Sequence, residues 1–161
     1  MIGKLYIVDK GNVKMLAQVD LLRFNEEQIR SRLVDKGFAY DSEIFIGEIT
    51  DWNVSNKFSL AEIKVLKLAY EGLYDGDEYV LVFLLKKHVP LTQIARCYYR
   101  FLGSDEVEAL ATILKDYDAK TLCTLFFKCH SWVNLMNAYM QEGILLATPK
   151  GYYLDMADKM K

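Results

Sequence analysis

The chain has few of the residues that interrupt or cross-link a polypeptide. It contains 2 prolines and 9 glycines in 161 residues, which argues against long flexible linkers. Its three cysteines, Cys97, Cys123 and Cys129, are an odd number without paired spacing, so a disulfide framework is not expected. We interpret them as reduced and mostly buried thiols.

Long hydrophobic runs are missing as well. The longest, from Tyr79 to Leu85, has seven residues, whereas a membrane-spanning helix needs about 20. The apolar run at the N-terminus stops at Asp9, which is too short for the hydrophobic region of a signal peptide. We therefore expect a soluble, cytoplasmic protein without a membrane segment.

Positive charge is not in excess. The 20 basic residues are outnumbered by 22 acidic ones, and the net charge is −2. Because proteins that grip nucleic acid through its phosphates usually carry a basic patch, direct nucleic-acid binding is not expected. Hydrophobic residues at 52% and charged residues at 26% are typical of a chain that folds.

The first third of the chain is predicted to be rich in β-structure. Strands over 4–9 and 13–19 form a hairpin around Gly11-Asn12. A helix begins at Asn25, buries Ile29 and Leu33, and ends at Gly37. A third strand over 43–49 precedes a polar loop over 51–57.

The remainder is predicted to be mainly helical, beginning with a capping box at Ser59-Leu60-Ala61-Glu62. Residues 78–88 are predicted to form a buried helix, although a strand is an open alternative for the segment from Tyr79 to Leu85. Ser104 is expected to cap the helix over 105–115. Further helices are expected over 91–102 and 121–142, and the latter could break near His130. A hairpin of residues 144–147 and 152–154 closes the chain.

These elements predict an α+β fold. It has a small N-terminal antiparallel β-sheet with one helix, a helical middle, and a C-terminal helix followed by a β-hairpin. The expected subdomains are residues 1–58, 59–118 and 119–161.

No pattern in the sequence specifies a catalytic or metal site. Cys123, Cys129 and His130 are close together, but structural zinc sites use recurring cysteine pairs that are missing here. A cysteine–histidine nucleophile is permitted, but nothing selects one pair. A DNA-binding helix-turn-helix over 91–114 would place acidic residues against phosphates, so a plain helical hairpin is preferred there. We expect no cofactor and no metal.

Aromatic residues form three doublets, at 98–99, 126–127 and 152–153. Aromatic platforms for nucleic-acid bases lie in basic grooves, which this composition does not favour. Core packing or an oligomer interface is the preferred interpretation.

Acidic residues gather in three stretches. Residues 37–56 and 68–85 contain no Lys or Arg, and Lys115 is the one basic residue in 105–118. Carboxylates can imitate the phosphates of duplex DNA, which carries about one charge per 1.7 Å, and can steer a DNA-binding cleft toward them. The alternative is that they are ordinary solvated charges. The candidate partner-binding residues are Asp41, Glu43, Glu48, Asp51, Glu71, Asp75, Asp77, Glu78, Asp105, Glu106, Glu108, Asp116 and Asp118.

A collinear series of short motifs resembles the ArdA-type antirestriction family over nearly the whole chain. The motifs are Tyr6-Ile7, residues 15–21, Asn25-Glu26-Glu27-Gln28-Ile29, residues 43–48, residues 59–63, and Gly143 followed by residues 148–153. The resemblance implies an elongated, non-enzymatic homodimer that mimics DNA and occupies the DNA-binding site of a type I restriction–modification enzyme.

The chain departs from that family in two ways. Family members are far more acidic, and the stretch Met136-Asn137-Ala138 replaces a Gly-Arg-Asp stretch. The resemblance and the acidic stretches together make an inhibitor of a host DNA-defence nuclease, acting through acidic faces, the leading hypothesis. The alternative is an anti-CRISPR or other phage or mobile-element protein that binds its partner through an apolar interface. A cysteine-dependent enzyme is the third hypothesis.

Overall fold

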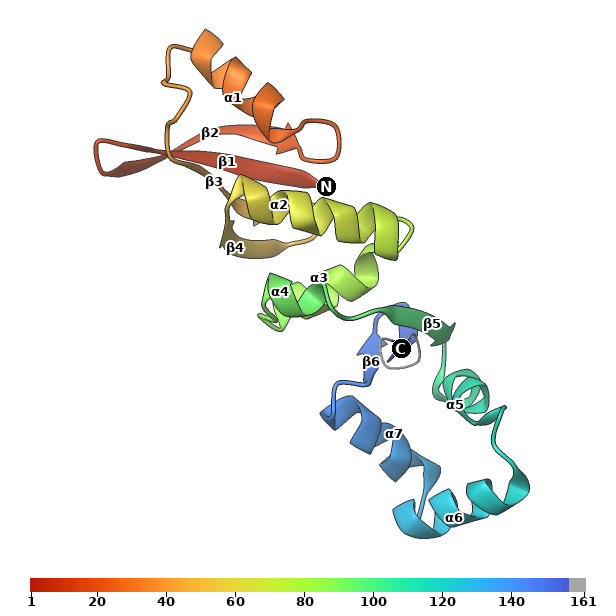
Figure 1. Ribbon diagram of the computed structural model, residues 1–161. Coiled ribbons are helices and arrows are strands. Elements are labelled where there is room, and N and C mark those ends of the chain that lie inside the picture. Colours follow the sequence, from red (N-terminus) through yellow and green to blue (C-terminus); the bar gives the residue numbers. More distant parts are fainter. Residues whose placement is uncertain (157–161) are drawn as a thin grey trace. The chain divides into compact units, whose positions relative to one another are not determined.

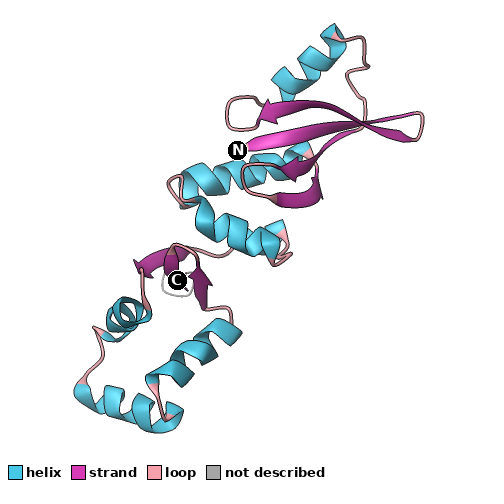
Figure 2. Cartoon of the chain, turned by 180° about the vertical axis from the view of Figure 1, so that it is seen from behind, coloured by secondary structure: helices cyan, strands magenta, loops and turns pink. Residues whose placement is uncertain are grey.

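The structure, a computed structural model, describes residues 1–156, which divide into two units (Figures 1 and 2). Unit 1 comprises residues 1–76 and 85–91, and unit 2 comprises residues 77–84 and continues from residue 92. The predicted α+β class is confirmed. The three-part division stays a prediction, and its boundaries at 58/59 and 118/119 fall inside unit 1 and unit 2, respectively.

Unit 1 contains a four-stranded antiparallel sheet. Its strands are β1 (Ile2–Asp9), β2 (Asn12–Asp20), β3 (Ile44–Ile49) and β4 (Val54–Phe58), in the order β2-β1-β3-β4. The predicted first hairpin and third strand are therefore confirmed. The tight turn is formed by Lys10 and Gly11, which both have positive φ, as a two-residue hairpin turn requires.

The polar loop expected over residues 51–57 is wrong in its second half, because β4 lies there. Val54 and Phe58 are buried, whereas the three residues between them are exposed. Two inward side chains separated by a polar stretch give almost no alternation in the sequence. The strand forms because its backbone pairs with β3, which the sequence pattern does not show.

Two helices pack against the sheet of unit 1, and both start as predicted. α1 (Glu26–Asp35) begins with a capping box between Asn25 and Gln28, and it buries Ile29 and Leu33. α2 (Leu60–Leu68) begins with the capping box of Ser59 and Glu62 and continues as a π-helical turn, η1 (Ala69–Leu73). Each box satisfies amides that the first helical turn leaves without partners.

Helix α3 (Glu78–Lys86) resolves the ambiguity at residues 79–85 in favour of a helix, and the division between the units falls within it. Val80, Leu81, Leu84 and Leu85 are all buried. Spacing at i, i+1, i+4 and i+5 places these side chains on one side of a helix.

Unit 2 contains a three-stranded antiparallel sheet in the order β5-β7-β6, formed by β5 (Tyr99–Gly103), β6 (Leu145–Thr148) and β7 (Gly151–Asp155). The predicted closing hairpin is confirmed as β6 and β7. The remaining helices are α4 (Leu91–Ile94), α5 (Glu106–Leu114), α6 (Ala119–Cys129) and α7 (Trp132–Gln141).

The helix expected over residues 91–102 is wrong, and so is the helical hairpin over 91–114. α4 ends at Ile94, and residues 99–103 form β5, which pairs with β7 about fifty residues later in the chain. Ser104 does not cap α5. The cap is Asp105, whose carboxylate accepts hydrogen bonds from the amides of Val107 and Glu108 at 2.8 and 2.9 Å.

The break expected near His130 is confirmed. His130 adopts a left-handed conformation with φ of 61° and ends α6, and Ser131 caps α7. Among residues 1–156, no helix combines the length and apolar character needed to cross a membrane.

β7 passes very close to the end of β5 at Gly151, and α5 approaches the same end at Gly103. A Cβ atom on Gly151 would lie 2.4 Å from the carbonyl oxygen of Gly103, and Gly151 has φ of +143°. A Cβ on Gly103 would lie 2.4 Å from the Cβ of Glu108. Only residues without a side chain fit at the crossing of β7 past β5 and at the contact of β5 with α5.

Gly151→Ala should therefore lower the free energy of unfolding of unit 2 by at least about 1–3 kcal/mol, the usual cost of a strained backbone conformation. Gly72→Ala is the control, because nothing lies within 4 Å of that Cβ position and its φ is not positive. Urea unfolding followed by NMR amide signals would measure each unit separately. Equal midpoints for Gly151→Ala and the wild type would contradict the crossing.

Candidate interaction surfaces

The first acidic group lies in unit 1 and is largely paired with basic groups. Glu48 is 2.6 Å from Lys4 on the neighbouring strand, and Glu43 is 3.3 Å from Lys57. Asp51 lies 3.0 Å from the N-terminal amine and accepts a hydrogen bond from the amide of Ile2 at 2.8 Å. These three carboxylates thus link β3 and its flanking residues to β1, to β4 and to the N-terminus.

The pKa of Asp51 shows the same engagement. Partial burial alone would raise it, but the hydrogen bonds from the Ile2 amide and the N-terminal amine lower it below its ordinary value. Asp41, the fourth member of the group, is exposed and takes part in no ion pair or side-chain hydrogen bond within residues 1–156.

The second acidic group is divided between the two units. In unit 1, Glu71 lies 4.0 Å from Lys67, one helical turn earlier, and Asp75 is exposed. In unit 2, Asp77 and the exposed Glu78 lie at the start of α3. The sequence stretch is therefore not one surface feature of a single unit.

The Asp77 carboxylate of unit 2 is bound by three groups. Its Oδ2 atom lies 2.5 Å from Nζ of Lys150 and accepts a hydrogen bond from the Tyr153 hydroxyl at 2.7 Å, while Oδ1 accepts from the amide of Tyr79. The Lys150 ammonium lies over the rings of Phe101 and Tyr79, at 5.4 and 5.8 Å. The cluster ties the start of α3 to the β6–β7 turn.

The pKa values of this cluster shift in opposite directions. Burial alone would raise the pKa of Asp77, but hydrogen bonds from Lys150, Tyr153 and the Tyr79 amide lower it below its ordinary value. The pKa of Tyr153 is raised well above its ordinary value, first by burial and then by its bond to the Asp77 carboxylate. The folded unit therefore favours an ionised Asp77 beside a neutral Tyr153.

The third acidic group lies around the ends of α5 and the start of α6, and most of its members are bonded within the chain. Glu106 accepts a hydrogen bond from the Tyr152 hydroxyl at 3.2 Å, and Glu108 accepts from the amide and hydroxyl of Ser104. Asp118 caps α6 through the Thr121 amide at 2.7 Å, which lowers its pKa. Asp105 caps α5, and Asp116 is exposed.

The distribution of charge supports the same interpretation. Unit 1 contains twelve basic and twelve acidic residues and is therefore neutral overall. Of the thirteen candidate residues, three (Asp41, Asp75 and Asp116) make no ion pair or side-chain hydrogen bond in the described chain. The remaining carboxylates each interact with at least one other group of the described chain.

The cysteines of the described chain are not part of a metal-binding cluster. In the described part of the chain, no group of three or more His, Cys, Asp or Glu side chains is placed to hold a metal ion. Burial and the nearby Asp155 carboxylate raise the pKa of Cys97, which disfavours its thiolate. Cys123 is exposed, which corrects the expectation of burial for that thiol, and the other two are half-buried.

α6 and α7 present an exposed apolar surface that includes the doublet Phe126-Phe127, for which the sequence suggested core packing or an oligomer interface. We call Phe126, Phe127, Trp132 and Val133 the aromatic face. Phe126 contacts Phe127 and Trp132, with ring centroids 6.3 and 5.3 Å apart. Phe127 and Val133 are 76% and 60% exposed, and Phe126 is 42% exposed. The doublet Phe126-Phe127 is therefore not packed into the core.

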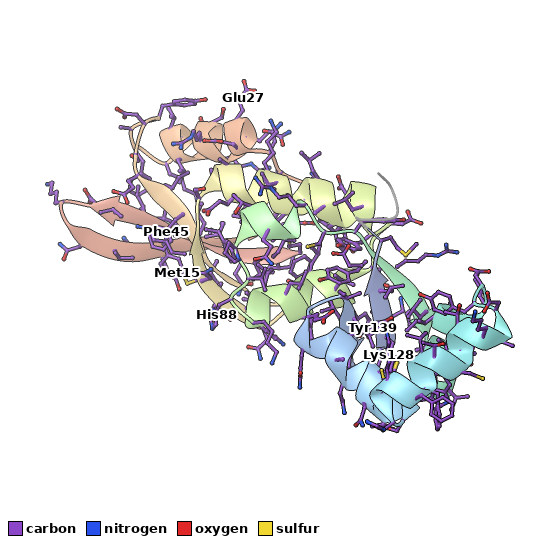
Figure 3. The ribbon with its side chains drawn as sticks, turned by 60° about the horizontal axis from the view of Figure 1, so that its bottom comes forward. Met15, Glu27, Phe45, His88, Lys128 and Tyr139 are labelled. Atoms are coloured by element: carbon purple, nitrogen blue, oxygen red, sulfur yellow. The ribbon has the colours of Figure 1, made fainter. Side chains whose placement is uncertain are left out.

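The aromatic face belongs to helices with almost no charge. No residue of α6 is buried, although six of its eleven residues are Leu, Phe or Cys. Residues 119–141 contain no carboxylate, and Lys120 and Lys128 are their basic residues. Figure 3 marks Lys128 on α6 and Tyr139 on α7. α7 also contributes Leu135 and Met136 to the core.

Asp77→Asn should weaken unit 2 by about 1–2 kcal/mol at pH 7, because it removes the charge that holds Lys150. The difference from the wild type should vanish at low pH. An Asp77 pKa that is lower in the folded state contributes stability above the ordinary carboxyl pKa of about 3.9, and this contribution is lost as the pH falls through the folded-state pKa.

NMR-monitored urea unfolding at pH 7, 5 and 3 would measure this difference on the amides of β7. Asp116→Asn serves as the control, because that carboxylate is exposed and should change stability little at any of these pH values. A difference for Asp77→Asn that stayed constant from pH 7 to pH 3 would contradict the proposed role of its charge.

Comparison of the chain with family models, with curated proteins and with solved structures found no match. The resemblance to the ArdA-type family therefore rests on the short motifs of the sequence. Any function of these surfaces has to be inferred from their chemistry.

Proposed function

We propose that this chain is a non-enzymatic protein that inhibits a host DNA-defence nuclease by binding one of its protein components through the aromatic face. The observation that carries the binding surface is α6, an amphipathic helix without a single buried residue. A cluster of apolar side chains left in water marks an interaction site more often than a neutral surface does. Aromatic residues are also enriched where interfaces gain most of their energy.

The choice of target is supported by the ArdA-like motifs, which suggest a counter-defence role. The choice of surface differs from what that resemblance implies, because most of the acidic residues are used inside the fold. A phosphate mimic needs carboxylates that a DNA-binding cleft can reach and pair with. Here Glu48, Asp51 and Asp77 already pair with cations of the same chain.

Replacing the aromatic face with charge tests the proposal. The double variant Phe127→Asp/Val133→Asp should lose binding and inhibition by tenfold or more, because carboxylates would enter an apolar contact. Val107→Asp is a matched control, since Val107 is 77% exposed but lies on α5. Tagged proteins would be co-expressed with a type I restriction–modification enzyme or a CRISPR effector, and retention measured at about 0.1 and 1 M NaCl.

An apolar contact should persist at high salt, where exposed charge pairs are screened. Equal retention of the double variant and the wild type would contradict this use of the aromatic face. The expected homodimer provides a further outcome. If light scattering showed a wild-type dimer and a monomeric double variant, the face would join two copies of the chain.

DNA mimicry is the second candidate, and it is favoured by the exposure of Asp41, Asp75 and Asp116. If the aromatic face is the contact, the triple variant Asp41→Asn/Asp75→Asn/Asp116→Asn should inhibit the nuclease as well as the wild type. A nuclease-protection assay over a series of inhibitor concentrations measures this. A tenfold loss of inhibition, together with binding that weakens steeply with salt, would favour mimicry.

A further inference from the structure

β2 is an edge strand of the unit 1 sheet. Its one neighbour in the sheet is β1, so the backbone groups on its outer edge have no strand partner in the described chain. An edge strand offers N–H and C=O groups to which another extended segment can pair. The register shifts between Leu5 and Tyr6 of β1, which makes Leu16 the extra residue of a β-bulge and leaves residues 17–20 as a regular stretch.

An open apolar cavity lies between this stretch and α1, which runs beside β2 (Figure 1). Its volume is about 340 Å³, and its walls include Leu5 and Ala17 of the sheet and Phe24, Ile29 and Leu33 from the α1 region. Leu5 and Ala17 are paired across the two strands, so their side chains share the face toward α1. This volume lies within the range of about 300–1,000 Å³ typical of ligand pockets.

Two cations at the C-terminal end of α1 line the same cavity. Arg32 and Lys36 are exposed, and none of the ion pairs in the described chain involves them. The Arg32 guanidinium lies 4.0 Å from the centroid of the Phe24 ring, which holds it beside the cavity. Asp35 is the one carboxylate among the lining residues, so the groove is positive by one charge.

We propose that the groove between β2 and α1 binds an extended peptide segment of a partner protein by strand addition. The segment pairs with the outer edge of residues 17–20, places a large apolar side chain in the cavity, and brings a carboxylate next to Arg32 and Lys36. A strand edge, an adjacent apolar pocket and a helix beside it are the components of peptide recognition by β-augmentation. Four residues of strand extend about 13 Å, which fits an extended peptide segment of about four residues.

This site lies in unit 1, whereas the aromatic face lies in unit 2. It therefore does not depend on the proposed function. The partner chemistry is also different, because the groove selects an acidic, extended peptide, while the aromatic face selects an apolar surface.

A displayed library of random 12-residue peptides, selected on the full-length protein, tests the proposal. Enriched peptides should combine a large apolar residue with a carboxylate. Fluorescence polarisation of a labelled enriched peptide should then show at least a tenfold loss of affinity for Ala17→Trp, which fills the cavity. Arg32→Glu/Lys36→Glu should cause at least a fivefold loss and changes only exposed side chains, so it remains informative if Ala17→Trp disturbs the sheet.

Lys14→Glu is the matched control, because Lys14 lies on β2 beyond the bulge and does not line the cavity. Phe127→Asp/Val133→Asp should also bind the peptide normally, which separates this site from the aromatic face. Strand pairing predicts that N-methylation of alternate peptide amides abolishes binding and that the intervening amides tolerate it.

Three results would overturn the proposal. They are no peptide enriched on the wild type over Ala17→Trp, affinities unchanged by Arg32→Glu/Lys36→Glu, and an N-methylation profile without alternation. A small apolar anion that bound the cavity while no peptide did would assign the groove to a small-molecule ligand instead.

Discussion

The hydrogen bond from the Tyr153 hydroxyl to the Asp77 carboxylate joins the first and last parts of unit 2. Tyr153 is 2% exposed and lies on β7, the central strand of its sheet, where its ring also packs edge-to-face against Phe101 of β5. Asp77 precedes α3 and is bound in addition by Lys150 of the β6–β7 turn. Because one carboxylate receives both partners, the start of α3, the turn and the central strand are held at a single point.

Carboxylates that are bound by groups of their own chain also explain why the acidic stretches are poor guides to function. A carboxylate that caps a helix or pairs across a sheet is placed by the fold, and its charge is already partly compensated. Asp105 and Asp118 lie where helix N-termini attract negative charge. The surface that the fold leaves largely without contacts is apolar. It lies on α6 and α7, in a part of the chain with few charges.

Local signals in the sequence were sufficient for much of the fold. The caps at Asn25 and Ser59, the first hairpin and the break at His130 depend on neighbouring residues and were predicted correctly. β4 and β5 were missed because their formation depends on partners elsewhere in the chain, such as the pairing of Tyr99 with Asp155. Without that partner, residues 91–102 have an acceptable helical pattern.

The candidate sites were less predictable than the fold. The caps by Asp105 and Asp118 could have been recognised from their position just before helical segments. The partners of Glu48 and Asp77 could not, since Lys4 and Lys150 are 44 and 73 residues away. The doublet Phe126-Phe127 has the composition of a core segment, and nothing in its neighbourhood indicates that the fold leaves it in water. The cavity beside β2 arises only when α1 is placed against the sheet.

The two units are interleaved along the chain, since residues 85–91 return to unit 1 after unit 2 has begun. A genetic exchange with one breakpoint could not transfer one unit without also transferring part of the other. A fragment that started at residue 92 would lack Asp77 and Tyr79 and with them the contacts around Lys150. The chain is therefore expected to be inherited and expressed as one piece, and a shortened version of unit 2 would have to begin at residue 77.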